Sequence, residues 1–163
     1  MFKRGGLYIR NITFGIADSL VSTVGLLSGI DASGTTRQAI LLTGIVYAFV
    51  EAFSMAVGSF ISEQSAEEYA IKGEVANRQP FVAGSIMFVS FIVASFIPIA
   101  PYFFLDSAQA LWLSIIISII ALLIVGLVSA KIVKVNMLKH SIRMALLGGM
   151  AIIIGVVVGK LVR

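Results

Sequence analysis

The chain has 163 residues, of which 59% are hydrophobic and only 12% charged, and its mean hydropathy is +1.05. Soluble domains contain roughly 45–50% apolar and about 25% charged residues, so this composition indicates a membrane protein without room for a separate soluble catalytic domain. The net charge of +4 comes from scattered basic residues that form no patch with interleaved aromatics, which excludes the usual pattern of a nucleic-acid partner. The chain has no cysteine, so disulfides and thiolate metal sites are excluded.

Five apolar runs are each long enough to cross a bilayer as a helix, which takes roughly 20 residues. None alternates polar and apolar residues as a barrel strand would. The sequence therefore predicts an all-α polytopic protein, a single transmembrane domain over residues 1–163, with spans at roughly 7–30, 39–61, 81–104, 108–130 and 142–161. The first run follows Lys3 and Arg4 as in a signal peptide, but it is too long for one and carries Asp18 in its middle.

The basic residues gather on one side of this topology. If the N-terminus is cytoplasmic, the cytoplasmic segments hold most of the twelve basic residues: Lys3, Arg4, Arg10, Lys72, Arg78, Lys131, Lys134, Lys139 and Arg143. The opposite side holds only Arg37, Lys160 and Arg163. The positive-inside rule therefore places the N-terminus and the acidic connector, residues 62–80, in the cytoplasm.

Small residues recur four apart in three of the predicted spans. These rows are Gly25 and Gly29, then Ala48, Ala52 and Ala56, and finally Gly155 and Gly159. Such rows let helix backbones approach closely, either within one chain or between two copies. Pro98 and Pro101 are predicted to kink or break the third span, which is tolerated where neighbouring helices satisfy the freed carbonyls.

Two of the eight acidic residues, Asp18 and Glu51, lie well inside predicted spans. A charged side chain at the centre of a membrane helix costs about 2.5–3.5 kcal/mol, so such residues usually face the bundle interior and serve a pathway. At about 1.5 Å per residue, Asp18 lies about 16 Å from the start of the first span, and Glu51 about 15 Å from the end of the second. Because these two helices run in opposite directions, both carboxylates are expected in one layer near mid-membrane.

Polar residues share a helix face with each acid. Asn11, Gly15 and Ser22 lie at helical spacing from Asp18, and Ser54, Met55 and Gly58 do so from Glu51. Carboxylates, a hydroxyl and a thioether suit a transition metal such as Fe²⁺ or Mn²⁺, and two close acids also suit proton exchange. The alternative is that the acids only hydrogen-bond neighbouring helices and that Met55 fills space.

The connector carries Glu63, Glu67, Glu68 and Glu74, which would collect cations at the mouth of a pathway. The alternative is a solvated helix end of mixed charge. His140 stands in a basic connector, where a surface role is expected. No nucleophile triad, phosphate loop or metal-protease motif occurs, so neither enzyme activity nor a cofactor is predicted.

Two segments resemble signatures of the vacuolar iron transporter family. Residues 10–20 resemble the family's first span, in which an Asp matching Asp18 is normally followed by Gly, where this chain has Ser19. Residues 54–62 resemble the family's Ser-Met-Ala-x-Gly-Glu-aromatic-x-Ser, with Ser59 in place of the usual Glu. Glu51 stands at a position that is usually small in the family. Weaker similarity continues through residues 97–102 and the glycine-rich last span.

The resemblance implies a homodimer in the lipid bilayer that exchanges Fe²⁺ or Mn²⁺ for protons, with the ion path between protomers. Together, the paired acids and the motif match predict export of the metal from the cytoplasm, with Asp18, Glu51 and Met55 as central ligands and Ser54 and Asn11 as helpers. The expected location is the cell membrane of a prokaryote or a vacuolar-type membrane of a eukaryote. Residues 62–80 are too few for the cytoplasmic metal-binding domain of some family members. The rival hypothesis is a non-transporting scaffold or assembly subunit, and an intramembrane enzyme comes third.

Overall fold

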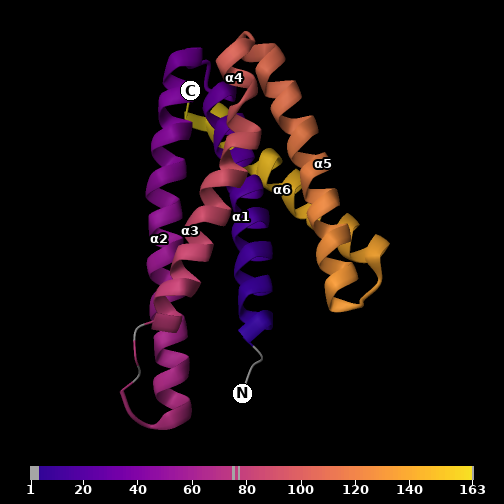
Figure 1. The fold of residues 1–163 in the computed structure, drawn as a ribbon. Coiled ribbons are helices and arrows are strands. Elements are labelled where there is room, and N and C mark those ends of the chain that lie inside the picture. The colour runs from indigo at the N-terminus through magenta and orange to yellow at the C-terminus, as the bar shows by residue number, and fades with distance from the viewer. Residues whose placement is uncertain (1–3, 75, 77, 163) are drawn as a thin grey trace.

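The computed structural model describes residues 4–74, 76 and 78–162, which form six helices (Figure 1). The helices are α1 (Arg4–Ala32), α2 (Arg37–Ile71), α3 (Arg78–Ile99), α4 (Pro101–Phe104), α5 (Ser107–Val133) and α6 (Met137–Val162). No strand occurs among the residues that the structure describes. All the helices except the short α4 are long and apolar enough to cross a membrane. The predicted fold class is confirmed, and the chain is an all-α integral membrane protein with five candidate spanning helices.

The two ends of the chain lie at opposite ends of the bundle (Figure 1). We call these ends the N-terminal side and the C-terminal side. The α2–α3 and α5–α6 connections lie on the N-terminal side, and the α1–α2 connection and α4 lie on the C-terminal side. The assignment of the N-terminal side to the cytoplasm stays a prediction. Of the basic residues on which it depends, Lys3 and Arg163 lie outside the described residues.

The second helix continues past residue 61, where the predicted span ends. Its last turns reach Ile71, and it stops at Lys72, whose φ of 53° is left-handed. A polar segment can extend a membrane helix into water because the helix satisfies its own backbone hydrogen bonds. The acids of the connector up to Glu68 therefore lie on a helix, with Glu63 and Glu67 one turn apart on the same face.

The two prolines interrupt the third span, as predicted. Pro98 lies in the last turn of α3, and Pro101 is the first residue of α4. Neither proline has a backbone N–H to donate. The Ser114 hydroxyl of α5 donates a hydrogen bond to the Pro98 carbonyl over 2.7 Å. A neighbouring helix thus satisfies a carbonyl at the break, which is how membrane helices tolerate proline.

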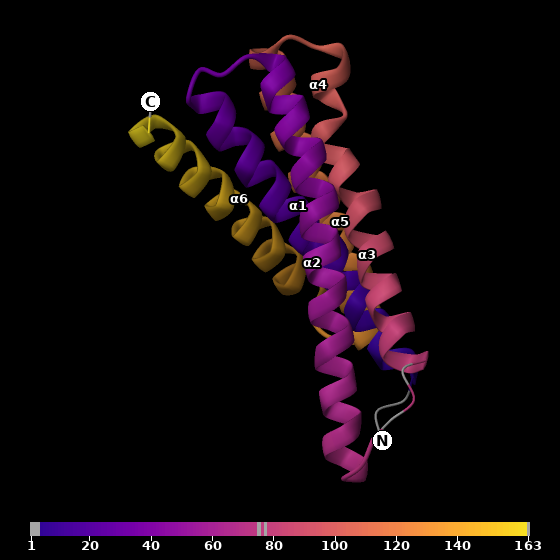
Figure 2. The same cartoon turned by 90° about the vertical axis from the view of Figure 1, so that its left-hand side faces the viewer.

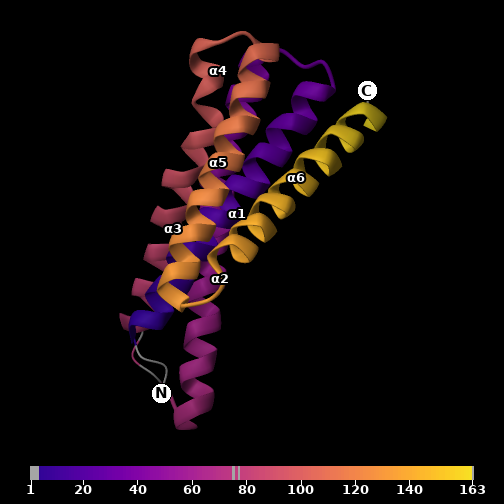
Figure 3. The ribbon, with the colours of Figure 1, turned by 90° about the vertical axis from the view of Figure 1, so that its right-hand side faces the viewer.

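Helix α1 is the centre of the bundle and contacts α2, α3, α5 and α6. Two side views show α6 crossing the other helices obliquely, and its C-terminal end diverges from α2 (Figures 2 and 3). Leu20 and Leu27 of α1 are fully buried and belong to two apolar clusters with residues of α3 and α5. Most of α6 is exposed apart from the face that it turns to α1 and α5.

The glycine rows of α1 and α6 pack against each other within the chain. A Cβ atom on Gly29 would lie 2.7 Å from the Gly155 carbonyl oxygen, and one on Gly25 would lie 3.1 Å from the Ala151 oxygen. Conversely, a Cβ on Gly159 would collide with the Gly29 carbonyl. Only glycine allows this approach, so the crossing of α1 and α6 depends on both rows.

The alanine row of α2 also packs inside the chain. Ala48 and Ala52 are buried, and a Cβ atom on Gly84 of α3 would lie 2.8 Å from the Ala56 carbonyl oxygen. All three rows of small residues therefore support helix contacts within one copy. The predicted homodimer is not tested by this packing.

Helices α1 and α3 run in parallel with a constant register. The Asn11 amide donates to the Ala83 carbonyl over 3.1 Å, and the Ser19 hydroxyl donates to the Phe91 carbonyl over 2.8 Å. Both pairs are separated by 72 residues along the chain. The same face of α1 carries Gly15, which leaves room for α3. Asp18, which precedes Ser19 on α1, interacts electrostatically with Glu51 of α2.

Candidate functional site

Asp18 of α1 and Glu51 of α2 are brought together across the interface between these helices. Both side chains are half-buried, and the two carboxylates are close enough to interact electrostatically. The Ser22 hydroxyl, one turn after Asp18, donates to the Asp18 backbone carbonyl over 2.7 Å. The pair lies well inside helices that are apolar enough to span a membrane. Two like charges at that depth favour binding a cation or a shared proton.

Tyr47 is a member of this cluster that the sequence analysis missed. Its hydroxyl lies beside the Ser22 side chain and within electrostatic reach of both Asp18 and Glu51. Its ring packs against Phe91 of α3, with ring centroids 6.5 Å apart at an interplanar angle of 59°. Tyr47 stands one helical turn before Glu51. This spacing of four was the available signal, but a tyrosine in an apolar run more often marks packing than chemistry.

The other predicted ligands of α2 differ in their exposure. Met55 is half-buried one turn after Glu51, on the same side of the helix. Ser54 is exposed on the surface of the chain, next to the exposed Phe53. For Ser54 to help bind a metal ion at the acid pair, it would therefore need contacts from outside this single copy. Met55, in contrast, already lies beside Glu51.

Asn11 joins three helices on the N-terminal side of the acid pair. It is 1% exposed, and its Nδ2 atom donates to the Ser59 hydroxyl of α2 and to the Ala83 carbonyl of α3, each over 3.1 Å. Ser59, the residue at the usual position of the family's Glu, is thus the partner of Asn11. Asn11 has a structural task in this arrangement, and its predicted role in metal binding stays a prediction.

Glu63 lies one turn further along α2, at the junction of the same three helices. Its Oε2 atom lies 3.6 Å from the Arg10 Nη2 atom of α1. Its Oε1 atom accepts a hydrogen bond from the Gln79 amide of α3 over 3.4 Å. The Glu63 side chain is 13% exposed, whereas the Arg10 side chain is 62% exposed. The carboxylate is therefore largely shielded, and its cationic partner reaches it from the solvent side.

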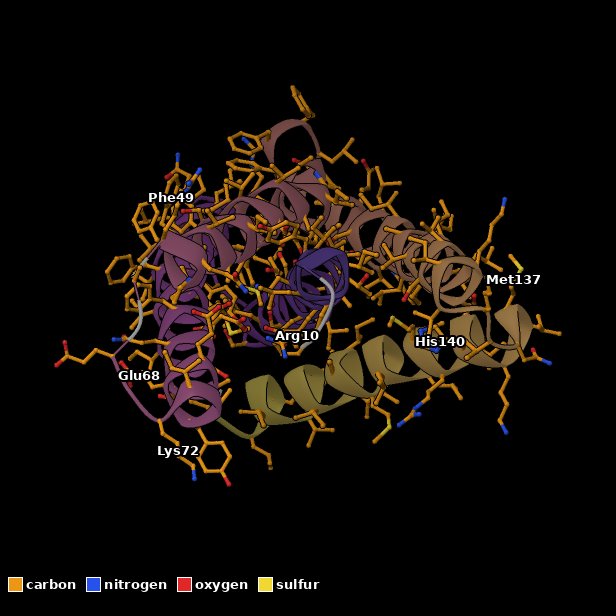
Figure 4. All side chains as sticks on the ribbon, turned by 60° about the horizontal axis from the view of Figure 1, so that its bottom comes forward. Arg10, Phe49, Glu68, Lys72, Met137 and His140 are labelled. Carbon is orange, nitrogen blue, oxygen red and sulfur yellow. The ribbon has the colours of Figure 1, made fainter. Side chains whose placement is uncertain are left out.

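The remaining acids of the connector lie in different places. Glu67 and Glu74 line a cavity of about 500 Å³ together with Tyr8 and Gln79. Glu68 accepts a hydrogen bond from Gln64 over 3.0 Å and, seen from the N-terminal side, lies at the outer edge of α2 (Figure 4). The cavity opens at the end of the bundle that carries the N-terminus.

Within the described part of the chain, no three His, Asp or Glu side chains gather into a metal-binding group. A metal ion between Asp18 and Glu51 would therefore need other donors to complete its coordination. The thioether of Met55 and the hydroxyl of Tyr47 are available on the same helix as Glu51, and water is a further donor. His140 is half-buried at the start of α6, far along the chain from this cluster (Figure 4).

A model of the VIT family matches residues 9–79 and 66–160 of the chain. Among curated proteins, vacuolar iron transporter homolog 2 of Arabidopsis thaliana is 24% identical over 173 aligned positions, which cover 99% of this chain and 87% of that protein. An uncharacterized protein of Methanocaldococcus jannaschii is 27% identical over 154 positions, covering 83% of this chain and 80% of the relative. A rice homolog is 38% identical, but only over 34% of this chain and 24% of its own length.

The family model spans nearly the whole membrane part, including the helices that carry Asp18, Glu51 and Met55. Five spanning helices and a half-buried acid pair are the structural context of that match. The resemblance noted in two sequence motifs thus extends over both halves of the chain. The chain belongs to the VIT family.

Proposed function

We propose that this protein transports divalent metal ions, Fe²⁺ or Mn²⁺, out of the cytoplasm in exchange for protons. The observation that carries this proposal is the electrostatic interaction between Asp18 and Glu51, two half-buried carboxylates on neighbouring spanning helices. Family membership and the names of its plant relatives, vacuolar iron transporter homologs, support the transport of a metal ion. The metal ion is the cargo of this reaction, and no bound cofactor is proposed.

The donors around the acid pair support a soft divalent cation. Two carboxylates supply hard oxygen ligands, and the thioether of Met55 adds a soft donor that Mg²⁺ and Ca²⁺ do not favour. When the metal leaves, the two carboxylates repel each other, and a proton taken up between them removes this repulsion. Metal and proton would thus compete for Asp18 and Glu51, which is the coupling that exchange requires.

The homodimer belongs to the same proposal. Helix α2 presents a row of exposed apolar residues next to the site, including Val46, Val50 and Phe53, and α6 is exposed over most of its surface. A second copy placed against α2 would cover the half-buried acid pair and Ser54. Counting protomers in nanodiscs by single-molecule photobleaching tests this, and a single bleaching step in most particles would contradict it.

The proposed function is tested with purified protein in vesicles that hold a metal-sensitive dye. The wild type should carry Fe²⁺ or Mn²⁺ into the lumen down a gradient, and the lumen should become more alkaline, because exchange moves protons out as the metal enters. Asp18→Asn and Glu51→Gln should reduce the flux to that of protein-free vesicles. Asp106→Asn is the matched control, because Asp106 is exposed at the start of α5 and makes no side-chain capping bond. Equal flux for wild type and Asp18→Asn, or none with any divalent ion, overturns the proposal.

A non-transporting scaffold is the second candidate, because Ser59 stands where the family usually has Glu and bonds to Asn11. In this case the wild type carries no metal, whereas Ser59→Glu gains flux. Transport by the wild type excludes this candidate.

A further inference from the structure

One face of α2 carries a side chain with a polar atom or sulfur at every fourth position from the middle of the membrane to the N-terminal side. We call it the α2 stripe, and it consists of Tyr47, Glu51, Met55, Ser59, Glu63 and Glu67. Residues four apart lie above one another on a helix, roughly 6 Å apart. Every member is buried or half-buried. Other faces of the same helix carry exposed apolar residues such as Val50, Val57 and Ile61.

The surroundings of four members of the α2 stripe follow one another along the helix from the N-terminal side. Glu67 lines the cavity on the N-terminal side, Glu63 pairs with Arg10, Ser59 bonds to Asn11, and Glu51 interacts electrostatically with Asp18. The three partner residues, Arg10, Asn11 and Asp18, all belong to α1. The α2 stripe therefore runs along α1 from the cavity to the acid pair.

Glu63 stands between the cavity and the rest of the α2 stripe, and Arg10 holds a positive charge there. The guanidinium and the carboxylate are 3.6 Å apart. Seen from the N-terminal side, Arg10 lies in the middle of the molecule, between α2 and α6 (Figure 4). A cation that moves from the cavity along the α2 stripe meets this guanidinium first, and like charges repel.

The two partners of Glu63 differ in exposure, because Gln79 is half-buried and Arg10 is largely exposed. Gln79 holds one carboxylate oxygen from α3 over 3.4 Å, whereas Arg10 contacts the other oxygen and is 62% exposed. An ion pair whose cationic partner is largely exposed is weak, so the guanidinium can turn into solvent while Gln79 keeps the carboxylate in place. The ion pair between Arg10 and Glu63 is thus the interaction that can break while Glu63 stays in place.

We propose that Arg10 is the gate between the cavity on the N-terminal side and the acid pair, held closed by its ion pair with Glu63. A divalent cation passes when it replaces the guanidinium at the Glu63 carboxylate and Arg10 turns away. This inference rests on the proposed function, because it assigns a step of that transport to Arg10.

The test compares initial flux of Mn²⁺ at concentrations below saturation in reconstituted vesicles. Arg10→Gln removes the charge and should raise the initial rate about two- to five-fold, the range expected for the loss of an exposed ion pair. Arg10→Lys retains the charge and should stay close to the wild type. Glu63→Gln removes the carboxylate that the cation needs and should lower the rate.

Arg78→Gln is the matched control, because Arg78 is exposed and lines the same cavity on α3. If Arg10 acted only by repelling cations from the mouth, both substitutions would raise the rate equally, and the gate would be excluded. A second readout is the double variant Arg10→Gln with Glu63→Gln, which should behave like Glu63→Gln alone. An unchanged gain in that background overturns the ion pair as the closing contact.

The two proposals fail in different ways. If the wild type carries no divalent ion, the proposed function fails. If the wild type and Arg10→Gln carry Mn²⁺ at the same rate, only the gate fails. Size-exclusion profiles and melting temperatures of all variants show whether each is folded, and Arg10→Lys with wild-type behaviour shows that the position accepts substitution.

Discussion

The Nδ2 atom of Asn11 lies 3.1 Å from the hydroxyl of Ser59, and this buried hydrogen bond joins α1 to α2 over 48 residues of sequence. The same nitrogen atom donates to the Ala83 carbonyl, so one side chain connects three spanning helices. Along these helices, the acid pair lies on one side of Asn11 and the Arg10–Glu63 ion pair lies on the other. Asn11 therefore sets the spacing of α1 and α2 for both.

We expect Asn11→Ala to lower the stability of the bundle by about 1–2 kcal/mol, because hydrogen bonds between membrane helices contribute amounts of this order. The measurement is the melting temperature in detergent, with unfolding in SDS as a second probe. Gln109→Ala, an exposed position in the first turn of α5, should change neither. Equal stability of Asn11→Ala and the wild type would show that the connection is dispensable.

Tyr47→Phe tests the residue that the sequence analysis missed. The ring contact with Phe91 is kept, so the stability should not change, whereas the hydroxyl beside Asp18 and Glu51 is lost. We expect this hydroxyl to act as an oxygen donor to the bound ion. Losing a polar partner of a charged group costs about 1.5–3 kcal/mol, so metal flux should fall roughly ten-fold. Tyr69→Phe, an exposed tyrosine near the end of α2, is the control. Unchanged flux in Tyr47→Phe would remove Tyr47 from the site.

The crossing of α1 and α6 predicts opposite effects for two neighbouring glycines. Gly155→Ala places a Cβ atom against the Gly25 carbonyl and should destabilise the fold by about 1–3 kcal/mol. Gly149→Ala meets nothing within 4 Å and should be neutral or stabilising by up to about 1 kcal/mol, because alanine favours helices. Thermal unfolding measures both. A Gly155→Ala protein as stable as the wild type would mean that α6 does not cross α1 through this row.

The hydrogen bonds of Asp31 on the C-terminal side should also stabilise the fold. Its Oδ2 atom accepts hydrogen bonds from the Ser107 hydroxyl over 2.6 Å and from the Tyr102 hydroxyl over 3.4 Å. Asp31→Ala leaves the fully buried Tyr102 without this acceptor and should cost about 1–3 kcal/mol. Asp106→Ala removes an exposed carboxylate next to Ser107 in the sequence and should leave the stability unchanged in the same unfolding experiment.

The sequence indicated the membrane class, the five spans and the pairing of Asp18 with Glu51 at one depth. Each follows from local properties, because apolar length decides whether a helix spans and the rise per residue decides how deep a side chain lies. The break at Pro98 and Pro101 was predictable for the same reason: proline acts on its own turn of the helix.

The partners of these residues were decided by the tertiary structure. The glycine rows of α1 and α6 could equally have met a second copy, and only their packing shows that they meet each other. The contacts of Arg10 with Glu63 and of Asn11 with Ser59 depend on the rotation and register of helices that are distant in sequence. Helical periodicity specifies which residues share a face, but the face that meets a neighbour is selected by the packing of the whole bundle.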